Sequence, residues 1–438
     1  MKNFILILFT LTLLSCKDDR SLNADQENNA PNNSIVKYDD LEKHLQVSRT
    51  HRLDQIDREV DSLKLVLRDK PRNIIDLGKV ASLLNERFDL LANVEDLNES
   101  VRFRESAVKY TAIKPERAQR LLAQSYIKQH RFKAADSVMK SFTQNYSSDE
   151  SKYVLFDIAM ELGQYDEAEQ LLQDLKNNSD YNYLIRSAKW NDYIGRLDNT
   201  ILAMEKAMKI AEKSGNTSWK LWSYSNIADY YGHDGQIQKS YDHYIKTLEI
   251  DPGNEYALKG ISWIAFSHDK NPEQSLEIIN KISERHPSPD YLLSRAEINE
   301  YLGDENKADS LRSVFTTQVD RSKYGSMYNA YLIEEYASRK NETGKALKIA
   351  IKEIENRSTP ETYDLLGYAL LQNGKRQEAL KNHQKYVINK TFEPVAQMHT
   401  ALIYKENNMQ KQSKELKKEL LEAEYELGPV TISQIKDI

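Results

Sequence analysis

The sequence predicts an all-α protein arranged as a solenoid of about ten stacked helix pairs. Residues that break helices are scarce, because the 438 residues include only 14 glycines and 10 prolines. After residue 70 a small residue recurs at intervals close to 34 positions, as expected of a repeated helix pair. Five glycines stand five residues before that small residue, where a helix pair must turn, and prolines fall at the junctions, where a helix must end.

Residues 1–15 have the pattern of a secretory signal peptide. Lys2 is followed by an apolar run from Phe4 to Leu14 and then by a small residue, Ser15. The run of about eleven residues is too short to span a bilayer as a helix. We therefore expect export, followed by removal of this segment.

Cys16 is the only cysteine of the chain, so an internal disulfide framework is excluded. The residues Leu13-Leu14-Ser15-Cys16 resemble the lipobox that lipoprotein signal peptidase reads, although Leu14 is bulkier than the usual residue there. The resemblance implies that the mature chain begins at a diacylated Cys16. The lipid would hold the protein to a membrane outside the cytoplasm.

Residues 16–36 are predicted to carry the lipid and to form a flexible tether. The run from Arg20 to Ser34 is rich in Asn and Ser and cannot bury enough apolar surface to fold. Lys17-Asp18-Asp19 resembles the short acidic export tag of surface lipoproteins from Bacteroidetes. That resemblance favours the cell surface over the periplasmic face of the outer membrane. The alternative is that these are ordinary linker charges.

Residues 37–70 are predicted to form one N-terminal capping helix. Apolar residues recur at helical spacing from Leu41 onward, and those from Leu53 to Leu67 follow about two heptads. Two heptads are too few for a coiled coil, so packing on the first repeat is the better interpretation. Pro71 ends the helix.

The repeats are predicted over residues 71–425. Seven of the nine gaps between successive small residues lie within two residues of 34, the series being Ser100, Ala135, Ala168, Thr200, Ser240, Ser275, Ala308, Ala346, Ala379 and Ser413. Five glycines each stand five residues before a small residue, where the turn needs positive φ: Gly163, Gly195, Gly235, Gly303 and Gly374. Prolines mark the junctions between repeats: Pro71, Pro115, Pro252, Pro287, Pro360 and Pro394.

The unit from Thr362 to Phe392 shows the pattern most clearly. Its two facing helix stripes are Tyr363, Leu366, Gly367 and Leu370 on the first helix, and Ala379, His383 and Tyr386 on the second. This pattern resembles the tetratricopeptide repeat (TPR), and the stretch from Trp219 to Pro252 resembles it too. The resemblance implies a TPR lipoprotein of Bacteroidetes type, with a superhelix and a concave groove. Residues 426–438, after the last repeat, are expected to form a C-terminal tail.

No pattern of catalytic or metal-ligating residues stands out in the sequence. There is no His-Glu-x-x-His pair, no Gly-x-Ser-x-Gly elbow, and Gly344-Lys345 lacks the upstream glycine of a phosphate loop. The nine histidines are scattered, and His383 occupies a packing position. We therefore expect no enzyme, no cofactor and no metal. The net charge of −6 is spread along the chain, so we expect no binding of nucleic acid.

Tyrosine is unusually frequent, with 26 copies. Four aromatic residues fall off the packing stripe, toward the expected groove, and form the candidate ligand-binding site: Trp222, Tyr328, Tyr331 and Tyr368. Rigid amphipathic rings are good anchors for peptides and sugars. The alternative is that these rings thicken the core between repeats.

The function expected from these features is a membrane-anchored, extracytoplasmic TPR scaffold that mediates protein–protein interaction. Its partner would be a protein or peptide in the concave groove, and its task assembly or secretion at the outer membrane. The alternative from another class is a carbohydrate-binding surface lipoprotein whose groove aromatics stack on a glycan. A purely structural spacer is the third possibility.

Overall fold

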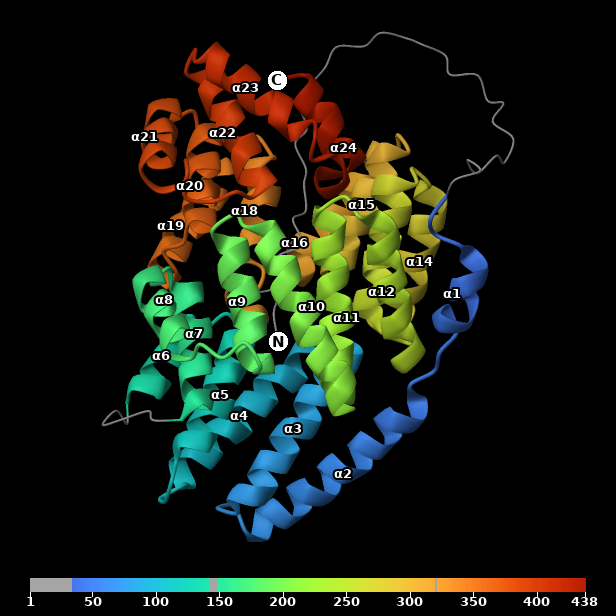
Figure 1. The fold of residues 1–438 in the computed structure, drawn as a ribbon, viewed down its shortest axis with the longest axis vertical. Helices are drawn as coiled ribbons and strands as arrows, with labels where there is room; N and C mark the ends of the chain where they lie inside the picture. The colour runs from blue at the N-terminus through green and yellow to red at the C-terminus, as the bar shows by residue number, and fades with distance from the viewer. Residues whose placement is uncertain (1–33, 142–147, 320) are drawn as a thin grey trace.

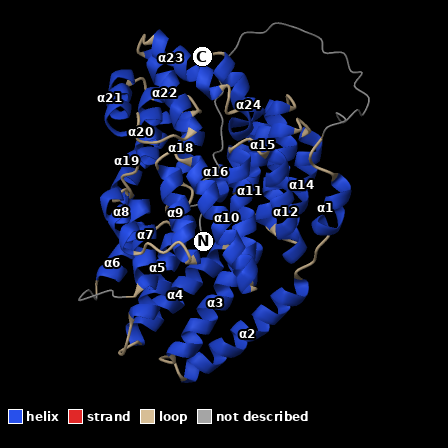
Figure 2. Ribbon diagram, in the orientation of Figure 1, coloured by secondary structure: helices blue, strands red, loops and turns tan. Residues whose placement is uncertain are grey.

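The structure, a computed structural model, describes residues 34–141, 148–319 and 321–438. Within these ranges every regular element is a helix (Figure 1, Figure 2). The predicted signal peptide (1–15), the lipidation site Cys16 and most of the predicted tether lie outside the described residues.

Ten helix pairs follow one another in the described residues, and the two helices of each pair pack together. The pairs are α3 (Ile74–Leu91) with α4 (Val94–Tyr110), α5 (Glu116–Lys128) with α6 (Phe132–Lys140), α7 (Asp149–Leu162) with α8 (Tyr165–Asp174), α9 (Tyr181–Tyr193) with α10 (Leu197–Ser214), α11 (Thr217–His233) with α12 (Ile237–Ile250), α13 (Glu255–Trp263) with α14 (Pro272–Arg285), α15 (Asp290–Tyr301) with α16 (Glu305–Gln318), α18 (Asn329–Ala337) with α19 (Thr343–Asn356), α20 (Pro360–Gln372) with α21 (Arg376–Tyr386), and α22 (Pro394–Glu406) with α23 (Gln410–Leu420). A π-helix, η1 (Ile264–His268), continues α13, and a short helix, α17 (Arg321–Tyr324), precedes α18. The predicted all-α, TPR-like solenoid is confirmed.

The small residues of the repeat lie where the two helices of a pair approach most closely. All ten sit on second helices of pairs and are at most 1% exposed. The Ser100 hydroxyl donates to the backbone oxygen of Ala81 at 2.6 Å, and the Ser413 hydroxyl to that of Ala401 at 2.9 Å. A larger side chain would force the helices apart, so the repeat phase read from the sequence is confirmed.

The turns inside the pairs use the predicted glycines. Gly374 has φ of 74°, and the Lys375 N–H donates to the Leu370 oxygen at 3.0 Å to close the end of α20. Positive φ also occurs at the other four predicted turn glycines: Gly163, Gly195, Gly235 and Gly303.

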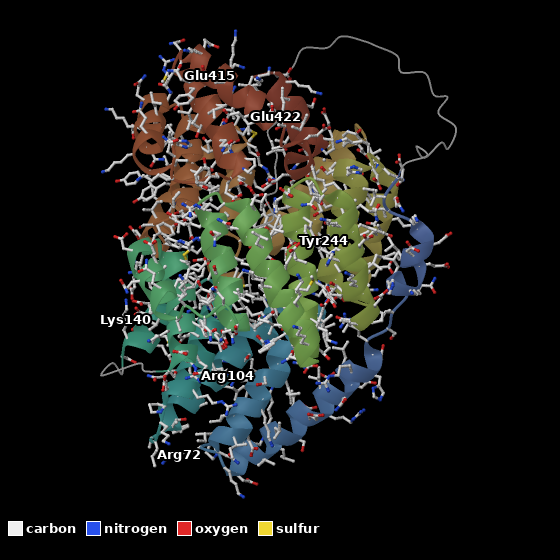
Figure 3. All side chains as sticks on the ribbon, viewed as in Figure 1. Arg72, Arg104, Lys140, Tyr244, Glu415 and Glu422 are labelled. Atoms are coloured by element: carbon white, nitrogen blue, oxygen red, sulfur yellow. The ribbon has the colours of Figure 1, made fainter. Side chains whose placement is uncertain are left out.

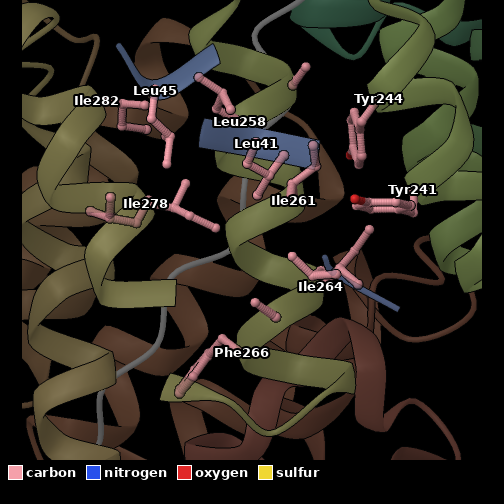
Figure 4. Close-up of a cluster of buried hydrophobic side chains, with 14 of the residues drawn as sticks. Leu41, Leu45, Tyr241, Tyr244, Leu258, Ile261, Ile264, Phe266, Ile278 and Ile282 are labelled. Atoms are coloured by element: carbon pink, nitrogen blue, oxygen red, sulfur yellow. The ribbon is translucent and has the colours of Figure 1, made fainter. Parts of the chain in front are cut away.

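The N-terminal segment is two helices, which corrects the single capping helix expected over 37–70. α1 (Tyr38–Leu45) and α2 (Thr50–Asp69) are separate because their apolar residues are buried in different places. Leu41 and Leu45 join the core around α12–α14 (Figure 4), whereas Ile56 and Val60 join the core around α3. Residues 34–36, expected in the tether, are also fixed, because the Asp269 carboxylate accepts the N–H groups of Ile35 and Val36 at 3.1 and 2.9 Å.

Residues 426–438 belong mainly to a packed helix, so the expected C-terminal tail is corrected. α24 (Glu424–Lys436) buries Leu427, Ile432 and Ile435 against α22 and α23. Its other side contacts α11, η1 and α15, nearly half the chain away (Figure 1). The apolar side chains of this segment are buried in two separate cores, and neither core could be predicted from the sequence.

The solenoid also packs against itself after one superhelical turn. The junction between α19 and α20 lies beside the turn between α7 and α8, where a Cβ on Gly163 would come within 2.4 Å of the Ser358 oxygen. The Arg357 Nη1 lies 3.4 Å from Glu161 Oε2 across this contact. Figure 1 shows α19 above α8, and α17 packs on α4. The closed superhelix is therefore held by contacts between its two halves.

Candidate binding surface on the concave face

The first helices of the pairs form the concave face. Neighbouring first helices contact one another directly, as in α5–α7–α9, α11–α13 and α18–α20–α22. In a curved array of helix pairs, neighbouring helices are closest together on the inner side, so the first helices lie on the inside of the curve. Side chains that leave the packing stripe of a first helix therefore face the concave side.

Three of the four predicted groove aromatics are half-buried and engaged with other rings. Trp222 on α11 stands edge-on to Tyr181, with ring centroids 6.3 Å apart. Tyr328 and Tyr331 lie together at the start of α18, 5.8 Å apart, and both contact Phe315. The structure thus brings Tyr328 and Tyr331 together and places Trp222 elsewhere; their binding role stays a prediction.

The exposure expected for Tyr368 is wrong. This side chain is 1% exposed and stacks on His399 with ring centroids 4.1 Å apart. The ring lies between α20 and α22, because this position of α20 faces the next first helix of the array. Tyr368 is therefore a packing residue of the repeat core.

Charged residues bridge the middle first helices of the concave face. Asp229 on α11 accepts hydrogen bonds from the hydroxyls of Tyr244 and Tyr256. Burial raises the pKa of Asp229 to about 6, although these two hydrogen bonds oppose the shift. The Lys259 ammonium on α13 pairs with the Asp290 carboxylate on α15. This part of the face combines a carboxyl that titrates near neutrality with a cation–anion pair.

A second group of carboxyls gathers where α24 meets the concave face. His233 Nδ1 lies 3.1 Å from Glu426 Oε2. Burial opposes protonation of His233, but Glu426 and then Asp229 raise its pKa to about 10. Glu393, just before α22, is exposed to solvent; desolvation by the surrounding protein, and then Glu426 and Asp192, raise its pKa. Carboxyls from α11, α24 and the start of α22 therefore act on one imidazolium.

A buried polar cluster in the last repeats is structural. His399 Nδ1 lies 2.8 Å from Asp364 Oδ2, and His383 Nδ1 lies 2.9 Å from Thr400 Oγ1. All four side chains are at most 5% exposed. Burial lowers the pKa of His383 to about 4, so its imidazole is neutral at pH 7. The predicted packing role of His383 is confirmed.

No group of three or more His, Cys, Asp and Glu side chains in the described ranges is arranged to hold a metal ion. No helix of the same ranges combines the length and apolar character needed to cross a bilayer.

Sequence reasoning missed the charged part of the concave face. Asp229 and His233 stand four residues apart on α11 and so share one helix face, which is a signal that the sequence contains. Their partners Glu426 and Glu393 come from α24 and α22, about 160 to 200 positions away in the chain. Only the closed superhelix brings them together.

No family model matches the chain, and no curated protein matches it. Among solved structures, the chain is similar to the crystal structure of the APC/C hetero-tetramer Cut9–Hcn1, with 12% identity over 92% of this chain and 99% of that chain, at a TM-score of 0.33. It is also similar to a tetratricopeptide repeat protein from Parabacteroides merdae ATCC 43184, with 15% identity over 59% and 96% and a TM-score of 0.33. Yeast Tom70 gives 14% identity over 91% and 95%, with a TM-score of 0.36.

Proposed function

We propose that this chain is a scaffold that binds a protein or peptide partner against its concave face. The observation that carries the proposal is the group of charged side chains that several first helices bring to that face, notably Asp229, which accepts from Tyr244 and Tyr256, and the pair of Lys259 with Asp290. Keeping ionisable groups in such surroundings opposes folding, and groups of this kind gather at functional sites. Their placement across several first helices suits an extended ligand better than a small molecule.

The place of action is proposed from the sequence. A lipid on Cys16 would tether the scaffold outside the cytoplasm at the outer membrane, with the cell surface favoured by Lys17-Asp18-Asp19. The anchor would raise the local concentration of the groove for membrane neighbours, in keeping with a role in assembly or secretion. Replacement of Cys16 by Ala should abolish acyl labelling and release the protein from membranes, and unchanged membrane retention without acyl label would contradict the anchor.

A glycan ligand finds less support. Stacking on sugar rings needs open aromatic faces, whereas Trp222, Tyr328 and Tyr331 are engaged with neighbouring rings. Protein binding is therefore the function that the geometry supports best.

The test is co-purification after crosslinking in native membranes. The double variant Asp229→Asn/Glu393→Gln removes two concave-face carboxyls and keeps the side-chain shapes. We expect the yield of crosslinked partner to fall about tenfold or more, which corresponds to about 1.4 kcal/mol. The matched control is Glu415→Gln/Glu422→Gln, which removes two exposed carboxylates at the α23 end of the molecule (Figure 3). Full recovery of partner by the concave-face variant would contradict the proposal.

A further inference from the structure

The N-terminal part of α24 is held by the kind of contacts that proteins use to bind peptides. The Tyr425 backbone oxygen accepts two side-chain hydrogen bonds, from Trp263 Nε1 at 3.0 Å and from Ser267 Oγ at 2.6 Å. The Tyr425 ring lies against Gly232, where an added Cβ would come within 2.8 Å of the ring. These contacts hold the start of α24 by one backbone oxygen and by one ring.

We name the residues that hold Tyr425, Glu426 and Gly428 the α24 seat. They come from three separate elements of the concave face, α11, the α13–η1 segment and α15, and are Gly232, His233, Trp263, Ser267 and Glu297. Ser267 lies in the π-helix η1, whose wider turn is a feature often found at functional sites.

The bottom of the α24 seat contains a buried carboxyl that α24 leaves without a partner. Glu297 is 1% exposed, and its Oε1 has no hydrogen-bond partner among the described residues. This oxygen lies 3.1 Å from the position that a Cβ on Gly428 would occupy. Neither Gly428 nor Pro429 has a polar side chain to reach this oxygen, and proline has no N–H. A buried carboxyl with an unused oxygen points to a missing donor.

The charges of α24 fit its seat only in part. Glu424 pairs with Lys270 and Glu426 with His233. Desolvation, and then like-charge repulsion from Glu426, raise the pKa of Glu393. Burial, and then Glu300, raise the pKa of Glu297 to about 8. The surroundings of the seat are therefore acidic, yet the segment that fills it brings a further carboxylate.

The backbone of α24 is irregular at the same place. Gly428 has φ of 75° and ψ of 163°, a conformation open almost only to glycine. The helix is thus broken directly over Glu297. The segment that occupies the seat does so with a distorted backbone, an unsatisfied carboxyl and a like-charge contact.

We propose that the α24 seat is a peptide-binding site that the chain's own C-terminal segment fills, and that its partner is a protein segment placing a basic side chain over Glu297. A Lys or Arg side chain there would form a charge-assisted hydrogen bond with the buried carboxyl. It would also replace the carboxylate of Glu426 beside Glu393. The partner must displace α24 from the seat, so the isolated chain is autoinhibited. This inference rests on the proposed function, because it names the partner chemistry for one part of the concave face.

The test is a fluorescence-anisotropy titration of labelled peptides against the full-length chain in detergent. The first probe is the peptide of residues 424–438. The second set carries a single Lys at each position from 426 to 430, and a third set carries Met at the same positions as a neutral control of similar length. The receptors are the wild-type chain and the variant Tyr425→Ala, whose own α24 is loosened because the ring against Gly232 is gone.

We expect the peptide of residues 424–438 to bind Tyr425→Ala about tenfold more tightly than the wild-type chain, because the seat is then less occupied. We expect at least one Lys peptide, but not its Met counterpart, to bind about tenfold more tightly still. Adding Glu297→Gln to the receptor should abolish that preference for Lys. The control receptor Tyr363→Ala, altered far from the seat, should behave like the wild-type chain.

Three outcomes would overturn the inference. They are equal binding to the two receptors, no gain from any Lys peptide, and a gain that persists with Glu297→Gln. If Tyr425→Ala fails to fold, as judged by circular dichroism, Val430→Ala serves instead, because Val430 packs on the same side of α24. If a partner co-purifies in a way that depends on Asp229 and Glu393 while no peptide binds the α24 seat, that result would contradict this inference and would still support the proposed function.

Discussion

At the scale of single residues, the interior of each pair depends on side chains too small to separate the helices. Ala379 on α21 is fully buried beside α20. Next to it, Gly367 lies against His383, where an added Cβ would come within 2.2 Å of the imidazole Nε2. These positions tolerate little added volume, because protein interiors are closely packed.

Ala379→Trp should therefore destabilise the last repeats. Overpacking of this kind costs roughly 1–3 kcal/mol or more in the free energy of unfolding. The effect should appear as a lower midpoint of thermal unfolding, with hydrogen exchange accelerated first in α20 and α21. Lys381→Trp on the exposed side of α21 is the matched control and should leave the midpoint nearly unchanged.

The raised carboxyl pKa values predict how stability depends on pH. Glu297, 1% exposed, has a pKa of about 8 in the folded chain, against an ordinary 4.5. Between these values the folded state holds more protons than the unfolded state, so stability falls as pH rises. His233, raised to about 10, acts in the same direction from its ordinary 6.5 upward.

We expect the thermal midpoint to decrease from pH 7 to pH 9, because below pH 7 the buried His383, whose pKa is lowered to about 4, acts in the opposite direction. Replacing Glu297 by Gln removes one of the titrating groups and should flatten this decrease, as measured by differential scanning calorimetry across the range. A midpoint that rises with pH in the wild-type chain, or a slope unchanged in Glu297→Gln, would contradict the assignment of these protons.

At the scale of elements, residues 34–45, which we call the N-terminal strap, pack on the middle repeats of the solenoid. Asp269, directly after η1, accepts from the Ser34 hydroxyl at 2.8 Å and from the N–H groups of Ile35 and Val36. Its side chain is 1% exposed. One carboxylate thus fixes the start of the described chain to a repeat more than 200 residues later.

Asp269→Ala should release this strap. Three donors lose their acceptor, at a cost of about 1–3 kcal/mol for buried groups left unpaired. We expect faster hydrogen exchange over residues 34–45 and earlier proteolysis next to α1, while α2 stays protected on α3. Asp242→Ala on the exposed side of α12 is the control. Unchanged exchange in α1 would show that its apolar contacts alone hold the strap.

At the scale of the whole molecule, a buried ionic network joins the two halves of the superhelix. Glu161 on α7 pairs with Lys189 at 2.8 Å and with Arg357 from the second half of the chain at 3.4 Å. Arg357 also pairs with Glu353 at 3.2 Å, and both are less than 10% exposed. The closed shape depends on these contacts because few elements other than α17 and α24 bridge the halves.

Arg357→Met should loosen the closed shape without unwinding the helices. Glu353, 3% exposed, would lose its cation, and stripping the partner from a buried ion pair costs about 3–5 kcal/mol. Glu161 is 26% exposed and keeps Lys189. Small-angle scattering should report a larger radius of gyration, while circular dichroism stays constant. Lys352→Met, on the exposed side of the same helix α19, should leave both unchanged. An unaltered radius in Arg357→Met would mean that the halves are held elsewhere.

The repeat could be predicted from local sequence patterns, because the helices of a pair and neighbouring pairs are close together in the chain. The spacing of Ala135, Ala379 and the other small residues, and the glycine five positions before five of them, identify both helices of a pair. Their burial and positive φ follow from contacts within one repeat or between neighbours. For the same reason the packing role of His383 could be predicted.

Features that depend on closure of the superhelix could not be predicted from the sequence. Several contacts join segments that are more than 150 residues apart in the chain. They include the packing of α1 and α24, the ion pair of Arg357 with Glu161, and the approach of Glu426 to His233. Each repeat is rotated slightly relative to the one before it, and these rotations add up over a full turn of the superhelix. The contacts between distant repeats depend on the total rotation, which no local sequence pattern specifies. The burial of Tyr368 shows the same limit, because one helical position decides whether a ring faces the concave side or the next repeat.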